Sequence, residues 1–102
     1  GNLWVTCDVS SASVAKGIYE PFGNNGLFYV PTSGSDSGEA FQFASGPVEA
    51  ELTGACFNEN EDTLFVSVQH PGEMTSDLQN PTSHWPTGSG LPKPSVVAIR
   101  GF

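Results

Sequence analysis

Three side chains that can bind a metal ion or move a proton stand at the ends of hydrophobic segments. Asp8 closes LWVTCD, Glu51 comes immediately before LTGACF, and His70 follows LFVSVQ. Carboxylate oxygens are the ligands that hard cations such as calcium prefer. An imidazole at the end of a strand can bind a phosphate oxygen, hold a ligand in place or donate a proton. These residue types therefore predict a metal site with Glu51 and Asp8 as ligands and His70 as a catalytic residue.

Simpler roles are open for the same residues. Asp8 and Glu51 can be solvated or turn-capping carboxylates, and His70, Pro71 and Gly72 can form a purely structural turn. Glu73, which follows that turn, is expected to be exposed rather than ligating. The sequence contains no G-x-S-x-G elbow, no phosphate-binding glycine-rich loop and no H-E-x-x-H motif, so other hydrolytic chemistries have less support.

The residues around these three predict an all-β fold with almost no helix. Short segments rich in aromatic and β-branched residues alternate with Gly, Asn and Pro, which is typical of strands and turns. Residues 10–19 are the one place where a helical turn is expected. The predicted strands are Leu3–Asp8, Gly26–Pro31, Ala40–Ala44, Leu52–Phe57, Leu64–Gln69 and Val96–Ile99.

Two stretches of the chain read as copies of one unit. GNLWVTCD and EDTLFVSVQ share the order of leucine, aromatic, valine and hydroxyl residue, and a second apolar strand follows each after a long connection. Repeated antiparallel units of four strands are the blades of β-propellers. The pattern predicts that residues 1–46 supply the last three strands of one blade. Residues 47–102 would supply the first three strands of the next, with a long loop over residues 71–94.

Two partial blades cannot close a propeller, so the chain is interpreted as a fragment of a larger one, and an independent β-sandwich is the alternative. Trp85 is expected to anchor the long loop to the surface below it. The two cysteines, Cys7 and Cys56, are interpreted as buried free thiols, with a disulfide or a metal site as open alternatives.

The charge of the chain limits its partners. Three basic residues stand against eleven acidic ones, for a formal net charge of −8. Nucleic acid and anionic membrane surfaces are therefore poor candidates. No apolar run is long enough to insert into a membrane and no signal peptide is present, although the chain opens without a methionine and such a segment could have been removed.

A family resemblance rests on several of these stretches taken in order. ELTGACF, DTLFVSVQHPGE, SHWP and PKPSVVAIRGF are similar to the C-terminal part of the PhoX family of bacterial alkaline phosphatases. GNLWVTCD and NNGLFYVPTSG resemble the blade that precedes it. The resemblance implies a calcium-dependent enzyme that hydrolyses phosphate monoesters and is exported to the periplasm or beyond. It also implies a six-bladed propeller that holds calcium and iron in its funnel through carboxylates and a cysteine.

The resemblance also limits what this chain can do by itself. Complete members of the family are several times longer, so the remaining blades are expected to supply most ligands and the 102 residues are expected to be inactive alone. Cys7 stands where the family is expected to have a threonine before the aspartate, which leaves the orientation of Asp8 open. The alternative function is a non-catalytic β-propeller or β-sandwich module for structure or binding.

Overall fold

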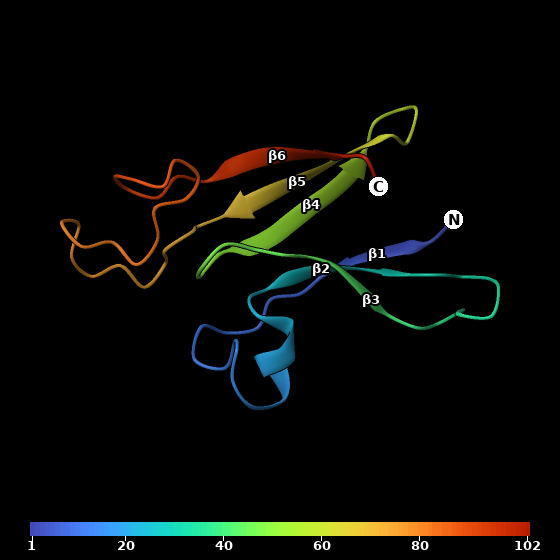
Figure 1. The fold of residues 1–102 in the computed structure, drawn as a ribbon, viewed down its shortest axis with the longest axis horizontal. Helices are drawn as coiled ribbons and strands as arrows, with labels where there is room; N and C mark the ends of the chain where they lie inside the picture. Colours follow the sequence, from blue (N-terminus) through green and yellow to red (C-terminus); the bar gives the residue numbers. More distant parts are fainter.

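The computed structural model describes residues 1–102 and consists of two antiparallel sheets of three strands each (Figure 1). In both sheets the strands are neighbours in the order of the sequence. The first sheet contains β1 (Leu3–Thr6), β2 (Gly26–Val30) and β3 (Phe41–Ser45), and the second contains β4 (Glu51–Phe57), β5 (Thr63–Gln69) and β6 (Ser95–Arg100). All six strands coincide with predicted segments to within two residues at either end, so the all-β class is confirmed.

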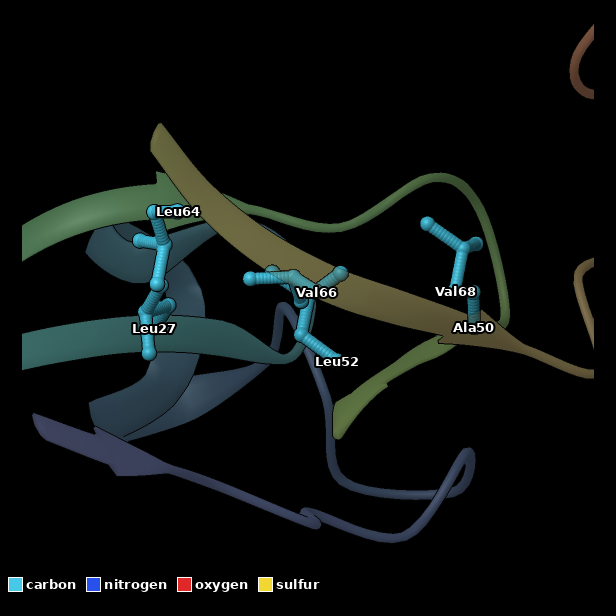
Figure 2. Close-up of a cluster of buried hydrophobic side chains, with 6 residues drawn as sticks. All are labelled: Leu27, Ala50, Leu52, Leu64, Val66 and Val68. Carbon is cyan, nitrogen blue, oxygen red and sulfur yellow. The ribbon is translucent and has the colours of Figure 1, made fainter. Parts of the chain in front are cut away.

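The core lies between the two sheets and is built by residues that alternate along the strands. In β5, Leu64, Val66 and Val68 are buried while the intervening Phe65 is exposed, because successive side chains of a strand point to opposite faces. Figure 2 shows these three side chains with Leu27, Leu52 and Ala50, which complete the cluster. Burial of each large aliphatic side chain stabilises the fold by about 1.5–3 kcal/mol.

Aromatic side chains connect the two sheets at the end opposite the long loop. The ring of Trp4 in β1 lies 5.1 Å from that of Phe43 in β3 and 5.2 Å from that of Phe57 in β4, in edge-to-face geometry. Such pairs add about 0.5–1.5 kcal/mol each beyond the area that they bury. Trp4 thus fixes the first sheet against the second, while only 12 of the 102 residues are buried in total.

A bulge in β4 explains why one prediction for the cysteines was wrong. The register of β4 against β5 shifts between Thr53 and Cys56, and Gly54 within this bulge has a φ of 61°, which glycine adopts without strain. The extra residue reverses the alternation, so the side chain of Cys56 is exposed rather than buried. Cys7 is half-buried, and both cysteines are free.

The two long connections differ from simple loops. Between β1 and β2 the chain forms a short 3₁₀ helix over Gly17–Phe22, so the predicted helical turn lies toward the end of the expected 10–19 segment and continues past it. Between β5 and β6 the predicted loop over residues 71–94 contains no strand. Its Trp85 packs against the core cluster, as expected for the anchor of this loop.

The topology brings three strand ends to one place. β1 and β5 run toward the same end of the molecule, and β4 starts there, beside the long loop (Figure 1). In the second sheet Glu51 pairs with Gln69 across the antiparallel ladder. His70, the next residue along the chain, must therefore lie next to Glu51.

Candidate active site

A polar cavity of about 290 Å³ opens at this shared end, between the two sheets. The segment after β1 contributes Asp8, and the second sheet contributes Glu51 and His70. The structure thus brings together all three residues that the sequence singles out for chemistry. The other side chains that line the cavity are Val9, Ser10, Ser11, Val14, Asn24, Asn25, Glu49 and Glu73.

Glu51 and His70 form an ion pair within the cavity. Oε1 of Glu51 lies 3.2 Å from Nε2 of His70, and the two side chains are only 19% and 30% exposed. The pairing of Glu51 with Gln69 sets this contact, because it places the first residue of β4 beside the first residue after β5. Partial burial strengthens the pair relative to one on an open surface.

The carboxyl groups of Glu51 and Asp8 lie side by side. Burial raises the pKa of Glu51 most, and the neighbouring Asp8 raises it further through a shared hydrogen bond and through its negative charge. The imidazole of His70 acts in the opposite direction, without cancelling the increase. A cation beside these two carboxylates would offset the cost of keeping Glu51 ionised.

A backbone carbonyl and a second carboxylate lie near the other ring nitrogen of His70. Its Nδ1 lies 3.3 Å from the backbone oxygen of Glu49 and 3.9 Å from Oε2 of Glu73. Burial alone would lower the pKa of His70, but the Glu49 carbonyl, the charge of Glu73 and the contact with Glu51 together raise it. Glu73 is half-exposed, as expected, and its Oε2 also accepts a hydrogen bond from Ser11 Oγ.

Glu49 is a site residue that the sequence analysis missed. Its carboxylate Oε2 accepts hydrogen bonds from the backbone N–H of Met74 at 3.0 Å and from Thr82 Oγ1 at 2.5 Å. Both Glu49 and His70 have positive φ angles, 60° and 37°, which are uncommon for residues other than glycine. Glu49 therefore ties the long loop to the segment before β4 while its carbonyl faces His70. A carboxylate two residues before Glu51 was the only signal in the sequence.

The donor set suits a hard cation only in part. The oxygens of Asp8 and Glu51 match the preference of calcium, which takes six to eight oxygen ligands. No group of three or more His, Cys, Asp or Glu side chains is arranged to hold a metal ion in the chain. Asp8 and Glu51 therefore supply only part of the oxygen set that a calcium ion needs.

The side chains that line the cavity fit an iron ion less well than a calcium ion. Cys7 does not line the cavity, and its sulfur accepts a hydrogen bond from the backbone N–H of Gly26 at 3.2 Å. The cysteine ligand that the family resemblance implies is thus absent from this donor set. Basic side chains are absent from the cavity lining too, and Arg100 donates its Nε–H to Thr63 Oγ1 at the far end of β5.

Taken together, the chain is an all-β protein with two antiparallel three-stranded sheets and a carboxylate-rich cavity where their strand ends meet. The family model described as alkaline phosphatase PhoX matches residues 1–72. The chain belongs to the PhoX family.

A solved structure extends this likeness beyond the residues that the family model matches. The chain is similar to Pseudomonas fluorescens PhoX in complex with vanadate, a transition state analogue, with 35% sequence identity and a TM-score of 0.70. The alignment covers 98% of the present chain but only 16% of the Pseudomonas fluorescens chain. A search of curated proteins finds no match.

Proposed function

We propose that this chain is a segment of a calcium-dependent alkaline phosphatase that hydrolyses phosphate monoesters, with Asp8 and Glu51 as metal ligands. The observation that carries the proposal is the adjacency of these two carboxylates. Asp8 follows a strand of the first sheet and Glu51 begins a strand of the second, and the two meet beside His70 in one cavity. Membership of the PhoX family adds the reaction class. A bound calcium ion would supply the positive charge that stabilises a phosphoryl group during hydrolysis.

Among the possible roles of His70, its contacts favour holding a ligand in place. Its Nε2 faces Glu51, and its Nδ1 faces the Glu49 carbonyl. A histidine with both ring nitrogens engaged orients its carboxylate partner and limits the rotation of that side chain. To donate a proton to a leaving group, His70 would first have to release Glu51. We therefore propose that His70 serves catalysis mainly through Glu51.

The remaining blades of a six-bladed propeller are the proposed partners of this chain. Each sheet has three strands, one fewer than a four-stranded blade, and the chain spans 16% of the Pseudomonas fluorescens chain. Several large apolar side chains are exposed, among them Leu3, Ile18 and Val96, which are 59%, 80% and 69% exposed. Neighbouring blades would cover these side chains and would supply the other calcium ligands and the iron site.

The proposed location is the periplasm or the extracellular space. Membership of the PhoX family supports this location, because the family resemblance implies export. No helix in the structure has the length and apolar character required to cross a bilayer. With only three basic residues against eleven acidic ones, nucleic acid is a poor candidate partner for the chain.

Calcium and vanadate titrations of the chain, followed by NMR, test this function. Calcium should shift the signals of Asp8, Glu51 and His70 first, and vanadate should perturb the same signals only when calcium is present. The variants Asp8→Asn and Glu51→Gln should lose both effects, whereas Glu59→Gln, in the exposed β4–β5 hairpin, should keep them. Shifts spread evenly over all carboxylates would instead support a non-catalytic module.

A further inference from the structure

Two consecutive asparagines line the wall of the cavity and have no part in the chemistry proposed above. Asn24 and Asn25 immediately precede β2, and both border the cavity that contains Asp8 and Glu51. Asn25 is only 6% exposed. A buried amide must have its donor and acceptor groups satisfied, so the partners of these side chains indicate what they hold in place.

Asn25 holds the segment that carries Asp8. Its Oδ1 accepts a hydrogen bond from the backbone N–H of Val9 at 2.6 Å, and its Nδ2 donates to the Val9 carbonyl at 3.1 Å. On the other side of Asp8, the backbone N–H of Cys7 donates to the Gly26 carbonyl at 3.2 Å. The amide thus continues the β1–β2 ladder beyond its last pair, Thr6 with Leu27, and fixes the backbone after Asp8, while the Cys7–Gly26 hydrogen bond fixes the backbone before it.

Asn24 holds the turn that leads into Glu51. Its Nδ2 donates to the Pro47 carbonyl and, at 3.4 Å, to the Gly46 carbonyl. The backbone N–H of Gly46 donates in turn to the Asn25 carbonyl at 2.8 Å. A Cβ atom at Gly46 would come 3.0 Å from that carbonyl oxygen, so a larger residue would force this contact apart by a few tenths of an ångström. Residues 46–50 are therefore docked on the two asparagines, and β4 begins with Glu51 directly after them.

We infer that Asn24 and Asn25 are positioning residues that set the distance between the carboxylates of Asp8 and Glu51. Asp8 follows the first sheet's β1 and Glu51 begins the second sheet's β4, and one dipeptide is bonded to the segments that carry both of them. Asparagine suits this task because the Asn25 amide accepts and donates at the same time and the Asn24 amide donates to two carbonyls, which neither an ionised aspartate nor alanine can do. The positioning role itself follows from the hydrogen bonds. It rests on the proposed function only where the distance between the Asp8 and Glu51 carboxylates is given a role in calcium binding.

The test uses the variants Asn24→Ala and Asn25→Ala of the 102-residue chain, with Asn58→Ala as the matched control. Asn58 also bonds through its side chain to backbone N–H groups, those of Asp62 and Thr63, but it lies in the β4–β5 hairpin. The first readout needs no metal: the ¹³C chemical shifts of the Asp8 and Glu51 carboxyl groups. Asn25→Ala should shift Glu51, although Asn25 makes no side-chain hydrogen bond to the second sheet. Asn24→Ala should correspondingly shift Asp8, and Asn58→Ala should shift neither.

The second readout is the affinity for calcium, measured by titration of the same variants. Loss of a group that orients metal ligands weakens binding by about 10–100-fold. We expect a loss of this size for both cavity variants in their folded state and less than about twofold for Asn58→Ala.

The outcomes separate the inference from the function on which it builds. Suppose that neither the unmodified chain nor any variant bound calcium, but that Asn25→Ala still shifted the Glu51 carboxyl signal and Asn24→Ala that of Asp8. The proposed function would then fail and the positioning role would stand. If Asn25→Ala left Glu51 unchanged, or if both cavity variants unfolded while Asn58→Ala remained folded, the positioning role would be overturned. In the latter case the two asparagines would serve the fold alone.

Discussion

Replacement of Glu51 by glutamine should change the stability of the chain in opposite directions with and without calcium. Glutamine has nearly the same shape as glutamate but carries no charge. In the absence of calcium, the ionised Glu51 is disfavoured, because burial and the neighbouring Asp8 raise its pKa above the usual 4.5. Glu51→Gln removes this cost and leaves the backbone pairing of Glu51 with Gln69 in place.

The size of the calcium-free effect follows from two opposing contributions. Loss of the ion pair with His70, at 3.2 Å, removes a Coulomb attraction of about 5 kcal/mol at an effective dielectric constant of 20, most of which solvation of the separated charges offsets. Relief from Asp8 and from burial favours the variant. Since the pKa of Glu51 is raised, the second contribution is the larger, and a net gain in stability is expected for the variant.

Calcium should reverse the order of stability. A cation that binds only the folded chain stabilises it by about 2.7 kcal/mol at one hundred times its dissociation constant. For a domain of about this size, 1 kcal/mol shifts the melting temperature by about 4–8 °C, so calcium should raise that of the unmodified chain by roughly 10–20 °C. Glu51→Gln should lose most of this increase because it lacks one of the two charged ligands.

Thermal unfolding followed by circular dichroism, with calcium titrated at constant ionic strength, measures both effects. Glu59→Gln is the matched control, since Glu59 is exposed in the hairpin between β4 and β5 and should respond to calcium like the unmodified chain. Equal calcium responses in Glu51→Gln and Glu59→Gln would refute the assignment of Glu51 as a ligand. A lower melting temperature for Glu51→Gln without calcium would show that the ion pair with His70 outweighs the repulsion from Asp8.

Three further substitutions probe the histidine, the long loop and the core. His70 has a raised pKa, so its contribution to stability is fully present below its ordinary value of 6.5 and is lost as pH rises through the folded value. Urea unfolding at a series of pH values should show this loss in the unmodified chain and a flatter profile in His70→Gln; identical profiles would contradict it. Glu49→Ala removes the acceptor for the Met74 N–H, so amide exchange at Met74 should accelerate at least about tenfold, with the exposed Glu39→Ala as control. Unchanged exchange in Glu49→Ala would mean that the loop is held by other contacts. Leu64→Ala, at a side chain with 0% exposure, should lower the free energy of unfolding by about 2–5 kcal/mol. Val96→Ala, where the side chain is 69% exposed, should lower the free energy of unfolding by less than about 0.5 kcal/mol. Equal losses in Leu64→Ala and Val96→Ala would show that Leu64 is not part of the core.

The strands were predictable because their signal is local. Alternation of Leu64, Val66 and Val68 with more exposed residues reflects the geometry of a single strand, whatever lies around it. The exposure of Cys56 was not predictable in the same way. It depends on a bulge at Gly54, and a bulge is a property of the pairing between two strands rather than of one segment.

The candidate site was predictable only in its ionisable members. Asp8, Glu51 and His70 could be chosen because carboxylates and histidines at strand ends are suited to metal and proton chemistry. Glu49, Asn24 and Asn25 could not, because their side-chain partners lie 16 to 33 residues away in the sequence. Hydrogen bonds over such separations form only when the sheets and loops are already packed together.

The sequence by itself determined the all-β class, the position of the six strands, the acidic charge and the three ionisable residues at strand ends, because each of these depends on residue type and short-range spacing. The tertiary structure alone decided that Asp8 and Glu51 would meet. Their approach requires the register of Glu51 with Gln69, the docking of two sheets and the bonds of Asn24 and Asn25 to both segments. Contacts between distant segments follow from the packing of the whole chain, which no local pattern of residues contains.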